Sequence, residues 1–180
     1  MPRPAVLLLA LLLAVPAARA ADSVPPAALP PACTGFQWDV RRELALLQAP
    51  AQAVAAGTSA ASAPTLALDR HYRVQLPPQA QVRLAARPGK PMLEDDARAG
   101  LLAFDVSRAG DYRIAITSGH WLDVVDAGRV IASRDFQGQR GCPLVHKIVA
   151  FRLPAGRLLL QLAGGADPEV GVVIVPLAGD

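Results

Sequence analysis

The stretch FDVSRAGDYRIAI, residues 104–116, decides the fold class predicted for this chain. On both sides of its centre apolar residues alternate with polar or small ones, which is the period of a half-buried β-strand. The centre, SRAG at residues 107–110, has the small and polar residues of a turn. The stretch therefore predicts two short strands joined by a tight connection.

The same pattern recurs along the chain from Thr65 to the C-terminal region. Short links between strands favour antiparallel neighbours, and no helix long enough for a parallel crossover lies among them. We therefore expect a mostly β fold, an antiparallel two-sheet sandwich of jelly-roll type, over residues 65–180. The predicted strands are Tyr72–Leu76, Val82–Leu84, Phe104–Val106, Tyr112–Ile116, Trp121–Val125, Val130–Ile131, Val145–Leu153, Leu158–Leu162 and Val170–Val175.

One short N-terminal helix is predicted before the sandwich. Thr34 is a candidate N-cap with Gln37 three residues later, which matches a capping box, and Pro50 stops the helix. Four apolar residues repeat at helical spacing and form one face: Phe36, Val40, Leu44 and Leu47. An exposed face of this kind would favour docking to another envelope protein.

The rest of residues 21–64 is predicted to lack regular structure. Residues 21–32 are rich in Pro and Ala and indicate an extended leader. Residues 51–64 are mostly Ala, Ser, Thr and Gly with few side chains that could pack, which is typical of a linker or a long surface loop.

The first twenty residues have the order of a cleavable signal peptide. Arg3 precedes an apolar run from Ala5 to Val15, and the small residues Ala18 and Ala20 occupy the positions that a signal peptidase reads. The run is shorter than the about 20 residues of a membrane-spanning helix. We expect a mature chain from Ala21 in the periplasm or outside the cell, with no transmembrane anchor after cleavage.

Charge and cysteine content support this compartment and exclude one class of partner. Residues 1–20 hold two Arg and no acidic residue, so 16 basic and 15 acidic residues remain after cleavage. Such a near-neutral chain lacks the basic surface that nucleic-acid binding needs. The two cysteines, Cys33 and Cys142, predict one disulfide in an oxidising compartment, with a reactive or metal-binding thiol pair as the alternative.

Residues 104–116 also resemble the pre-peptidase C-terminal and carbohydrate-binding-like modules of exported bacterial proteins, which pair two strands around an A-G-x-Y turn. Here the turn is Ala109-Gly110-Asp111-Tyr112. Tyr112 is expected to place its ring in the core with its hydroxyl near a partner. The resemblance implies a β-sandwich that binds something.

A second resemblance covers most of the mature chain. Cys33, Phe36-x-Trp38, the run Trp121–Val125, Cys142 and Lys147 stand in an order similar to that of a family of small uncharacterised exported bacterial proteins. Some members carry the label homogentisate 1,2-dioxygenase, which implies iron held by two His and one carboxylate. The three histidines of this chain, His71, His120 and His146, form no H-x-H or H-x-x-x-H pair.

The most specific candidate site is the cluster of His120, Trp121 and Asp123. A tryptophan and a carboxylate at a sheet edge could hold a sugar ring, by stacking and by accepting hydroxyl donors. Period two puts Trp121 and Asp123 on one face of a strand and His120 on the other. The alternative is structural: Trp121 packs against the sheet, and Asp123 balances an arginine.

The sequence thus favours a non-catalytic periplasmic β-sandwich that binds an envelope glycan or a partner protein, without a cofactor. The alternative is a metal-dependent, dioxygenase-like enzyme that uses His71, His120 and His146 as ligands. No nucleophile elbow or phosphate-binding loop is present in the sequence. Four strand arginines are expected to point outward and keep the sheets soluble: Arg70, Arg73, Arg83 and Arg113.

Overall fold

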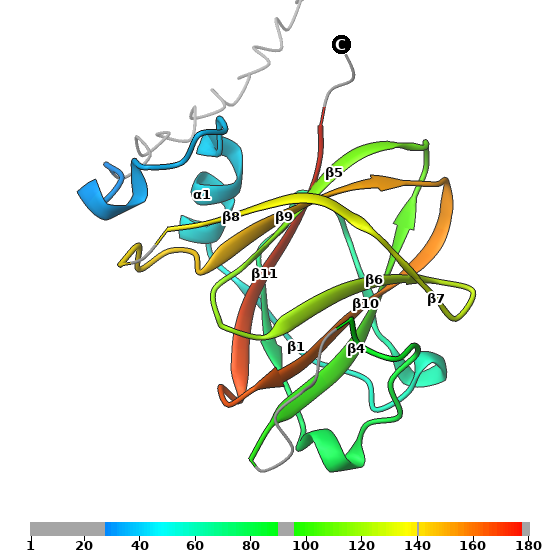
Figure 1. Ribbon diagram of the computed structural model, residues 1–180. Coiled ribbons are helices and arrows are strands. Elements are labelled where there is room, and N and C mark those ends of the chain that lie inside the picture. The colour runs from blue at the N-terminus through cyan, green and yellow to red at the C-terminus, as the bar shows by residue number, and fades with distance from the viewer. Residues whose placement is uncertain (1–27, 90–95, 140, 178–180) are drawn as a thin grey trace, which may run out of the picture.

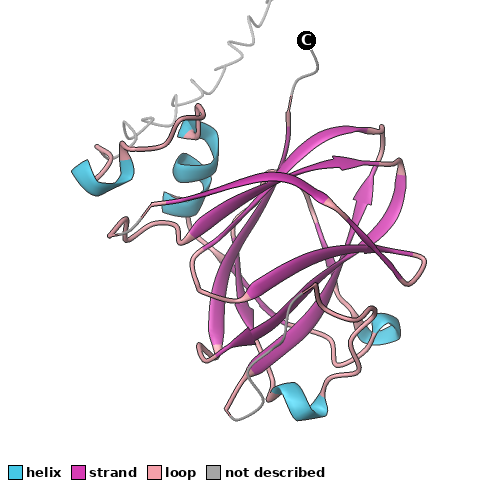
Figure 2. Ribbon diagram, in the orientation of Figure 1, coloured by secondary structure: helices cyan, strands magenta, loops and turns pink. Residues whose placement is uncertain are grey.

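The computed structural model describes residues 28–89, 96–139 and 141–177. Two β-sheets pack against each other, and a short helix lies outside one of them (Figures 1 and 2). The mostly β, two-sheet architecture predicted from the sequence is confirmed. The predicted signal peptide and its cleavage point lie outside the described residues.

The strands and helices follow one another with short connections. One α-helix and three short 3₁₀ helices precede or separate the strands within the described residues. In chain order the elements are η1 (Pro31–Cys33), α1 (Arg41–Gln48), β1 (Gln52–Ala55), η2 (Ala60–Ser62), β2 (Thr65–Leu66), β3 (Tyr72–Gln75), η3 (Gln79–Gln81), β4 (Arg98–Val106), β5 (Gly110–Ile116), β6 (Trp121–Asp126), β7 (Arg129–Ile131), β8 (Ser133–Gly138), β9 (Lys147–Leu153), β10 (Gly156–Gly165) and β11 (Glu169–Pro176).

The larger sheet has six strands in the order β1-β3-β11-β5-β9-β8, and the smaller has five in the order β2-β4-β10-β6-β7. Most pairs are antiparallel, but β1 with β3 and β2 with β4 are parallel. Ala132 alone separates β7 from β8, so the chain passes there from one sheet to the other (Figure 1). The jelly-roll type of connection stays a prediction.

The alternation in residues 104–116 builds the inner core between the sheets. Phe104 and Val106 from β4 meet Tyr112, Ile114 and Ile116 from β5 in one buried cluster. Tyr112 has its ring in this core and its hydroxyl donates to the carbonyl of Arg108 at 2.9 Å, so the hydroxyl lies near a partner as expected. Period two therefore places the large apolar side chains as the sequence predicted.

The short links, however, do not all make hairpins. The short links at residues 107–109, 117–120, 132, 154–155 and 166–168 each join a strand of one sheet to a strand of the other. The expectation that short links imply antiparallel neighbours is wrong at these places. A short link can carry the chain over the end of the core, and the apolar alternation of each strand is the same in either case.

The predicted helix begins later than expected. Thr34 is not its N-cap, because its Oγ1 donates to the carbonyl of Pro31 in η1 at 2.8 Å. The backbone N–H of Gln37 donates to Oε1 of Gln137 on β8, so residues before Arg41 lie along the sheet. The helix starts at Arg41, whose backbone N–H donates to Oδ1 of Asp39 at 3.2 Å.

The apolar face of α1 is buried on the outer face of the six-stranded sheet. Val40, Leu44 and Leu47 lie in a second core cluster, with residues of β5, β9 and β11 beneath them. The disulfide between Cys33 and Cys142 is present and ties this region to the link between β8 and β9. The helix face is therefore unavailable to a partner protein.

Two further segments differ from the prediction. Residues 52–55, in the stretch expected to be a linker, form β1 beside β3. Residues 82–84, expected to be a strand, run as a loop, because the N–H of Val82 donates to the carbonyl of Gln79 in η3 and that of Arg83 to the carbonyl of Thr58 at 2.8 Å. Within the described part of the chain, no helix is long and apolar enough to cross a membrane.

Candidate functional site

Trp121 and Asp123 lie together on the outer face of the five-stranded sheet. The indole Nε1 of Trp121 donates to Oδ1 of Asp123 at 2.9 Å. Trp121 is half-buried, whereas Asp123 is only 4% exposed. The hydrogen bond holds the indole plane in one orientation at the start of β6.

The structural alternative expected Asp123 to balance an arginine, but no arginine of the described residues is bonded to it. Besides the indole, its described side-chain partner is Gln161, whose Nε2 lies 3.4 Å from Oδ2. Burial raises the pKa of Asp123 above its usual range, although the hydrogen bonds from Trp121, Gln161 and the backbone of Gly89 act in the opposite direction. The carboxyl is thus a structural acceptor rather than an exposed ligand.

Gln161 is a polar residue of this region that sequence reasoning missed. It is 1% exposed, and its Oε1 accepts from the N–H groups of Ala85 and Ala86 at 2.8 and 3.1 Å. Its Nε2 donates to the carbonyl of Ala86 at 3.1 Å. The only signal in the sequence is a glutamine between the inward-facing Leu160 and Leu162, at a position expected to face outward.

Gln161 therefore holds the loop of residues 82–89 against the outer face of the sheet. The loop also reaches the tryptophan, because a Cβ placed on Gly89 would lie 3.2 Å from Cζ2 of Trp121. On another side, the ammonium of Lys147 lies 5.7 Å from the centroid of the indole ring. Trp121 is the residue of the predicted cluster that keeps an accessible surface.

His120 lies on the opposite side of β6 and has no exposed surface. Its Nδ1 is 2.7 Å from the hydroxyl of buried Ser118, and its Nε2 is buried with no hydrogen-bond partner in the described part of the chain. A Cβ on Gly165 would lie 2.6 Å from ring atoms of His120, so the imidazole rests directly on that backbone.

Burial lowers the pKa of His120, because the charged imidazolium would lose its hydration. The negative charge of Asp167 opposes this shift, and the positive charge of Lys147 adds to it. His120 is therefore expected to be neutral in the folded protein. It is separated from Trp121 and Asp123 by the strand, so the three predicted residues do not form one surface.

The three histidines are not brought together as a metal site. His71 places Nδ1 2.9 Å from the carbonyl of Ala49, whereas His146 is exposed on the far side of β5 and β11. In residues 28–89, 96–139 and 141–177, no group of three or more His, Cys, Asp or Glu side chains could hold a metal ion. The ligand set proposed for the enzyme alternative is thus not assembled among these residues.

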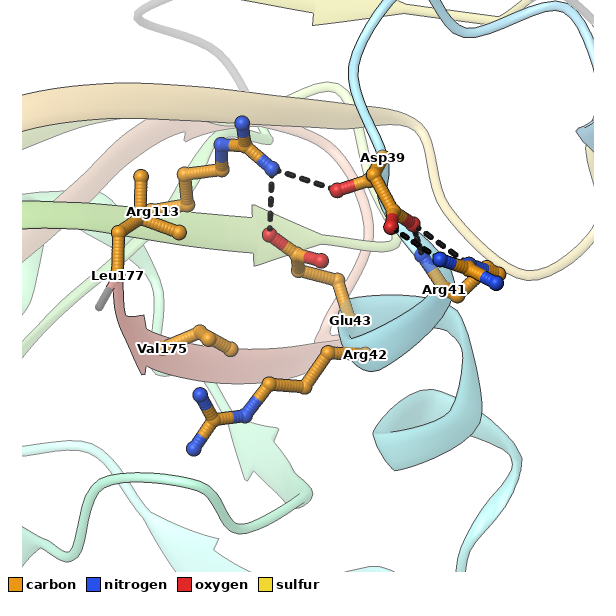
Figure 3. Close-up of a pocket in the computed structure, with 7 residues that line it drawn as sticks. All are labelled: Asp39, Arg41, Arg42, Glu43, Arg113, Val175 and Leu177. Carbon is orange, nitrogen blue, oxygen red and sulfur yellow. Dashed lines mark hydrogen bonds and ion pairs between the residues drawn. The ribbon is translucent and has the colours of Figure 1, made fainter. Parts of the chain in front are cut away.

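A polar hollow of about 830 Å³ lies beside the N-terminal end of α1 (Figure 3). Glu43 of α1 is 1% exposed, and its Oε1 accepts from Nη1 of Arg113 on β5 at 3.3 Å. The same Nη1 donates to the carbonyl of Asp39 at 2.8 Å, and the guanidinium lies 4.7 Å from the centroid of Trp38. The sequence predicted that Arg113 points outward into solvent. Instead, its side chain fastens α1 to the six-stranded sheet.

The other arginines of this hollow are also paired. Arg41 binds the carboxylate of Asp39 at 2.5 Å, which with the backbone bond lowers the pKa of Asp39 to about 2. Arg42 lies 2.7 Å from the carboxylate of Asp69, in the link between β2 and β3. Each positive charge has an acidic partner, so the hollow is an ion-paired contact between α1 and the six-stranded sheet.

Comparison with known proteins gives only distant structural likenesses. No known protein family matches the chain, and no curated protein matches it. The chain is similar at 12% identity to the pre-peptidase C-terminal domain of a collagenase from Bacillus anthracis, with a TM-score of 0.38 over 70% of this chain and 97% of that one.

Two structures of a β-glucosidase from Kluyveromyces marxianus, one in complex with glucose, match at 12% identity and a TM-score of 0.33. The two matches cover 47% and 53% of this chain but only 11% and 12% of the β-glucosidase chain. TM-scores this low place the chain in none of these classes. Its own strand pairing and disulfide define the class, a disulfide-bonded two-sheet β-sandwich.

Proposed function

We propose that this chain is an exported, non-catalytic β-sandwich module that binds an envelope glycan or a partner protein in the periplasm or outside the cell. Residues 1–20 would be the signal peptide, residues 21–64 the leader, helix and Ala-rich segment, and residues 65–180 the sandwich domain. The disulfide between Cys33 and Cys142 supports an oxidising compartment. The resemblance of residues 104–116 to pre-peptidase C-terminal modules agrees with a binding role.

The observation that carries the proposal is the fixed, half-buried indole of Trp121. Asp123 accepts a hydrogen bond from the indole N–H of Trp121, and the loop of residues 82–89 packs against one part of the ring. A large ring that is already ordered loses little conformational entropy when a ligand binds, which is why such rings often dominate binding energy. In this proposal Trp121 contacts the ligand, and buried Asp123 and His120 position its strand.

The test compares Trp121→Ala with Trp38→Ala in mature protein purified from the periplasm. Both indoles are half-buried, but Trp38 lies in the segment before α1, under the guanidinium of Arg113 on the six-stranded sheet. We expect wild type and Trp38→Ala to co-sediment with purified peptidoglycan sacculi, and Trp121→Ala to bind at least tenfold more weakly. Equal binding by wild type and Trp121→Ala, with a lowered melting temperature for the latter, would make Trp121 a packing residue only.

The same preparation tests the non-catalytic part of the proposal. The protein is purified without a histidine tag, and its metal content is measured by mass spectrometry. We expect less than stoichiometric transition metal, and an N-terminus at Ala21. A stoichiometric metal would instead favour the enzyme alternative.

A further inference from the structure

The link of residues 117–120 joins the end of β5 in one sheet to the start of β6 in the other. Its last residue, His120, has no exposed surface and directly precedes Trp121. Along the link, exposed Thr117 and Gly119 alternate with buried Ser118 and His120. The position of the indole at the start of β6 therefore depends on how this link is held.

The imidazole of His120 anchors the link by packing against backbone. A Cβ built on Gly165 of β10 would lie 2.6 Å from ring atoms of His120, so the ring occupies the space that a side chain there would need. Nδ1 of the ring is 2.7 Å from Oγ of Ser118, two residues earlier in the same link. The contact with Gly165 thus attaches the link to β10, whereas the hydrogen bond lies within the link.

The neutral and the charged imidazole have different needs at this position. Nε2 of His120 is buried and has no hydrogen-bond partner among residues 28–89, 96–139 and 141–177. A neutral ring can keep that nitrogen unprotonated, whereas the imidazolium carries an N–H on both nitrogens. A buried N–H of a charged ring without an acceptor costs more free energy than a neutral nitrogen does. Protonation therefore favours any conformation in which Nε2 reaches water.

Charged and titratable groups from neighbouring elements act on this balance. Asp167, exposed between β10 and β11, attracts a proton on His120, and Lys147 of β9 repels it. The exposed His146 has its Nε2 3.9 Å from a Cβ built on Gly119, so it lies beside the same link. An imidazolium in water would keep its hydration and would still be attracted by Asp167.

Two features couple His120 to the indole of Trp121. The residues are adjacent in the chain, so a shift of the His120 backbone moves the start of β6. The ammonium of Lys147, which repels a charge on His120, lies 5.7 Å from the centroid of the indole ring. On the other face of the strand from His120, Oδ1 of Asp123 accepts the indole N–H. A displaced first residue of β6 would lose that hydrogen bond.

We propose that His120 is a pH-sensitive latch: when its imidazole is protonated, residues 117–120 detach from Gly165 and the indole of Trp121 loses its fixed orientation. The consequence for binding rests on the proposed function, because a ligand would then have to order the indole again. At neutral pH the latch is closed, since burial holds the pKa of His120 below its usual value of about 6.5. Binding at Trp121 should therefore weaken as the pH falls below about 6.5.

The first experiment needs no ligand. In mature, disulfide-bonded Trp38→Phe protein, Trp121 is the remaining tryptophan, and acrylamide quenching of its fluorescence is measured from pH 8 to pH 5. We expect quenching to rise about twofold in one transition below about pH 6.5, with an unchanged far-ultraviolet circular dichroism spectrum. The imidazole resonances of His120 should titrate with the same midpoint. Quenching that does not change with pH would overturn the latch.

The variants separate His120 from the other titrating groups. His120→Gln should abolish the transition, and His146→Gln, which changes the exposed histidine beside the same link, is the matched control and should keep it. In Asp167→Asn, an exposed change that should not affect folding, loss of the carboxylate should move the midpoint about 0.3 units or more to lower pH. A transition that persists in His120→Gln belongs to another group, such as the Asp123 carboxyl, and overturns the latch. An unshifted midpoint in Asp167→Asn does the same.

The second experiment measures co-sedimentation with purified peptidoglycan sacculi at pH 7.5 and pH 5.0. We expect wild type to bind about tenfold more weakly at the lower pH, and binding by His120→Gln to change less than about twofold. If no sacculus binding occurs at either pH while quenching depends on His120, the proposed glycan binding fails and the latch stands. If binding needs Trp121 but neither binding nor quenching depends on His120, the latch fails and the proposed function stands.

Discussion

Glu43 shows how one buried charge can fix the position of a helix. Its carboxylate is 1% exposed, and its partner Arg113 on β5 keeps only 16% of its side chain exposed. Removing one partner of such a pair leaves the other charge partly buried without compensation, which costs more than the intact pair contributes. The sequence suggested an outward, solubilising Arg113, because period two alone cannot show that a helix covers that face.

We therefore expect Glu43→Ala to lower the free energy of unfolding by about 2–3 kcal/mol, as for the loss of a hydrogen bond to a charged group. Arg41→Ala is the control on the same helix, because its pair with Asp39 is exposed and should contribute nothing measurable. Urea unfolding followed by circular dichroism measures both. A similar loss in the two variants would show that Glu43 has no special role.

His120 predicts a pH dependence of stability. Its pKa in the folded protein is below the usual value of about 6.5, because the ring is buried and Nε2 has no partner among the described residues. The unfolded chain then binds the proton more readily than the folded one. The stabilisation is complete above about pH 6.5 and is lost as the pH falls toward the folded-state pKa.

This is tested by comparing wild type with His120→Gln in urea between pH 8 and pH 5. The wild-type midpoint should fall more steeply below about pH 6.5 than that of the variant, which has no titrating group at this position. His71 and His146 are present in both proteins and cancel in the comparison. Parallel curves would contradict a neutral, buried His120.

At the scale of elements, the side chain of Gln161 provides the hydrogen bonds that hold a loop on the sheet. The side chain satisfies two N–H groups and one carbonyl of residues 85–86, so this segment lies on the sheet without β-pairing. The alternation of Val82 and Leu84 suggested a strand, but the N–H of Arg83 donates to the carbonyl of Thr58, which lies outside the strands. A partner 75 residues later in the chain could not be found from local sequence.

Gln161→Leu should release this loop. We expect faster hydrogen exchange at Ala85 and Ala86, and a loss of about 1–3 kcal/mol in the free energy of unfolding, because two N–H groups lose their acceptor. Gln75→Leu, an exposed glutamine on β3, is the matched control and should change stability by less than about 0.5 kcal/mol. Unchanged exchange in Gln161→Leu would show that the loop is held by other contacts.

At the scale of the whole molecule, the disulfide closes a large part of the chain. Cys33 and Cys142 are separated by 109 residues, and the bond joins the segment before α1 to the link between β8 and β9. In the chain-entropy description, a loop of this size stabilises the folded state by about 4–5 kcal/mol. Export to an oxidising compartment would then matter for stability as well as for location.

The double variant Cys33→Ser with Cys142→Ser should therefore lower the free energy of unfolding by up to about 4–5 kcal/mol while retaining the β-sheet signal. Reduction of the wild type with dithiothreitol should give the same shift in the urea midpoint. If reduced and oxidised protein unfold at the same urea concentration, the bond does not contribute to stability.

The sequence by itself determined the features that depend on near neighbours in the chain. Alternation in residues 104–116 and in Leu158–Leu162 determined which side chains enter the inner core, and Val40, Leu44 and Leu47 determined the buried face of α1. The two cysteines were enough to predict the disulfide. These features follow from the repeat of the backbone or from the chemistry of one residue type.

Only the tertiary structure decided which sheet each strand joins and which side chains meet. Residues 107–109 look like a hairpin turn but cross between sheets, because alternation is identical in the two arrangements. His120, Trp121 and Asp123 adjoin in the chain, yet the strand separates them and burial removes two from solvent. One surface hollow is lined by residues as far apart in the sequence as Thr117 and His146. They lie close together because β5, β8 and β9 pair in one sheet, and no local pattern predicts this.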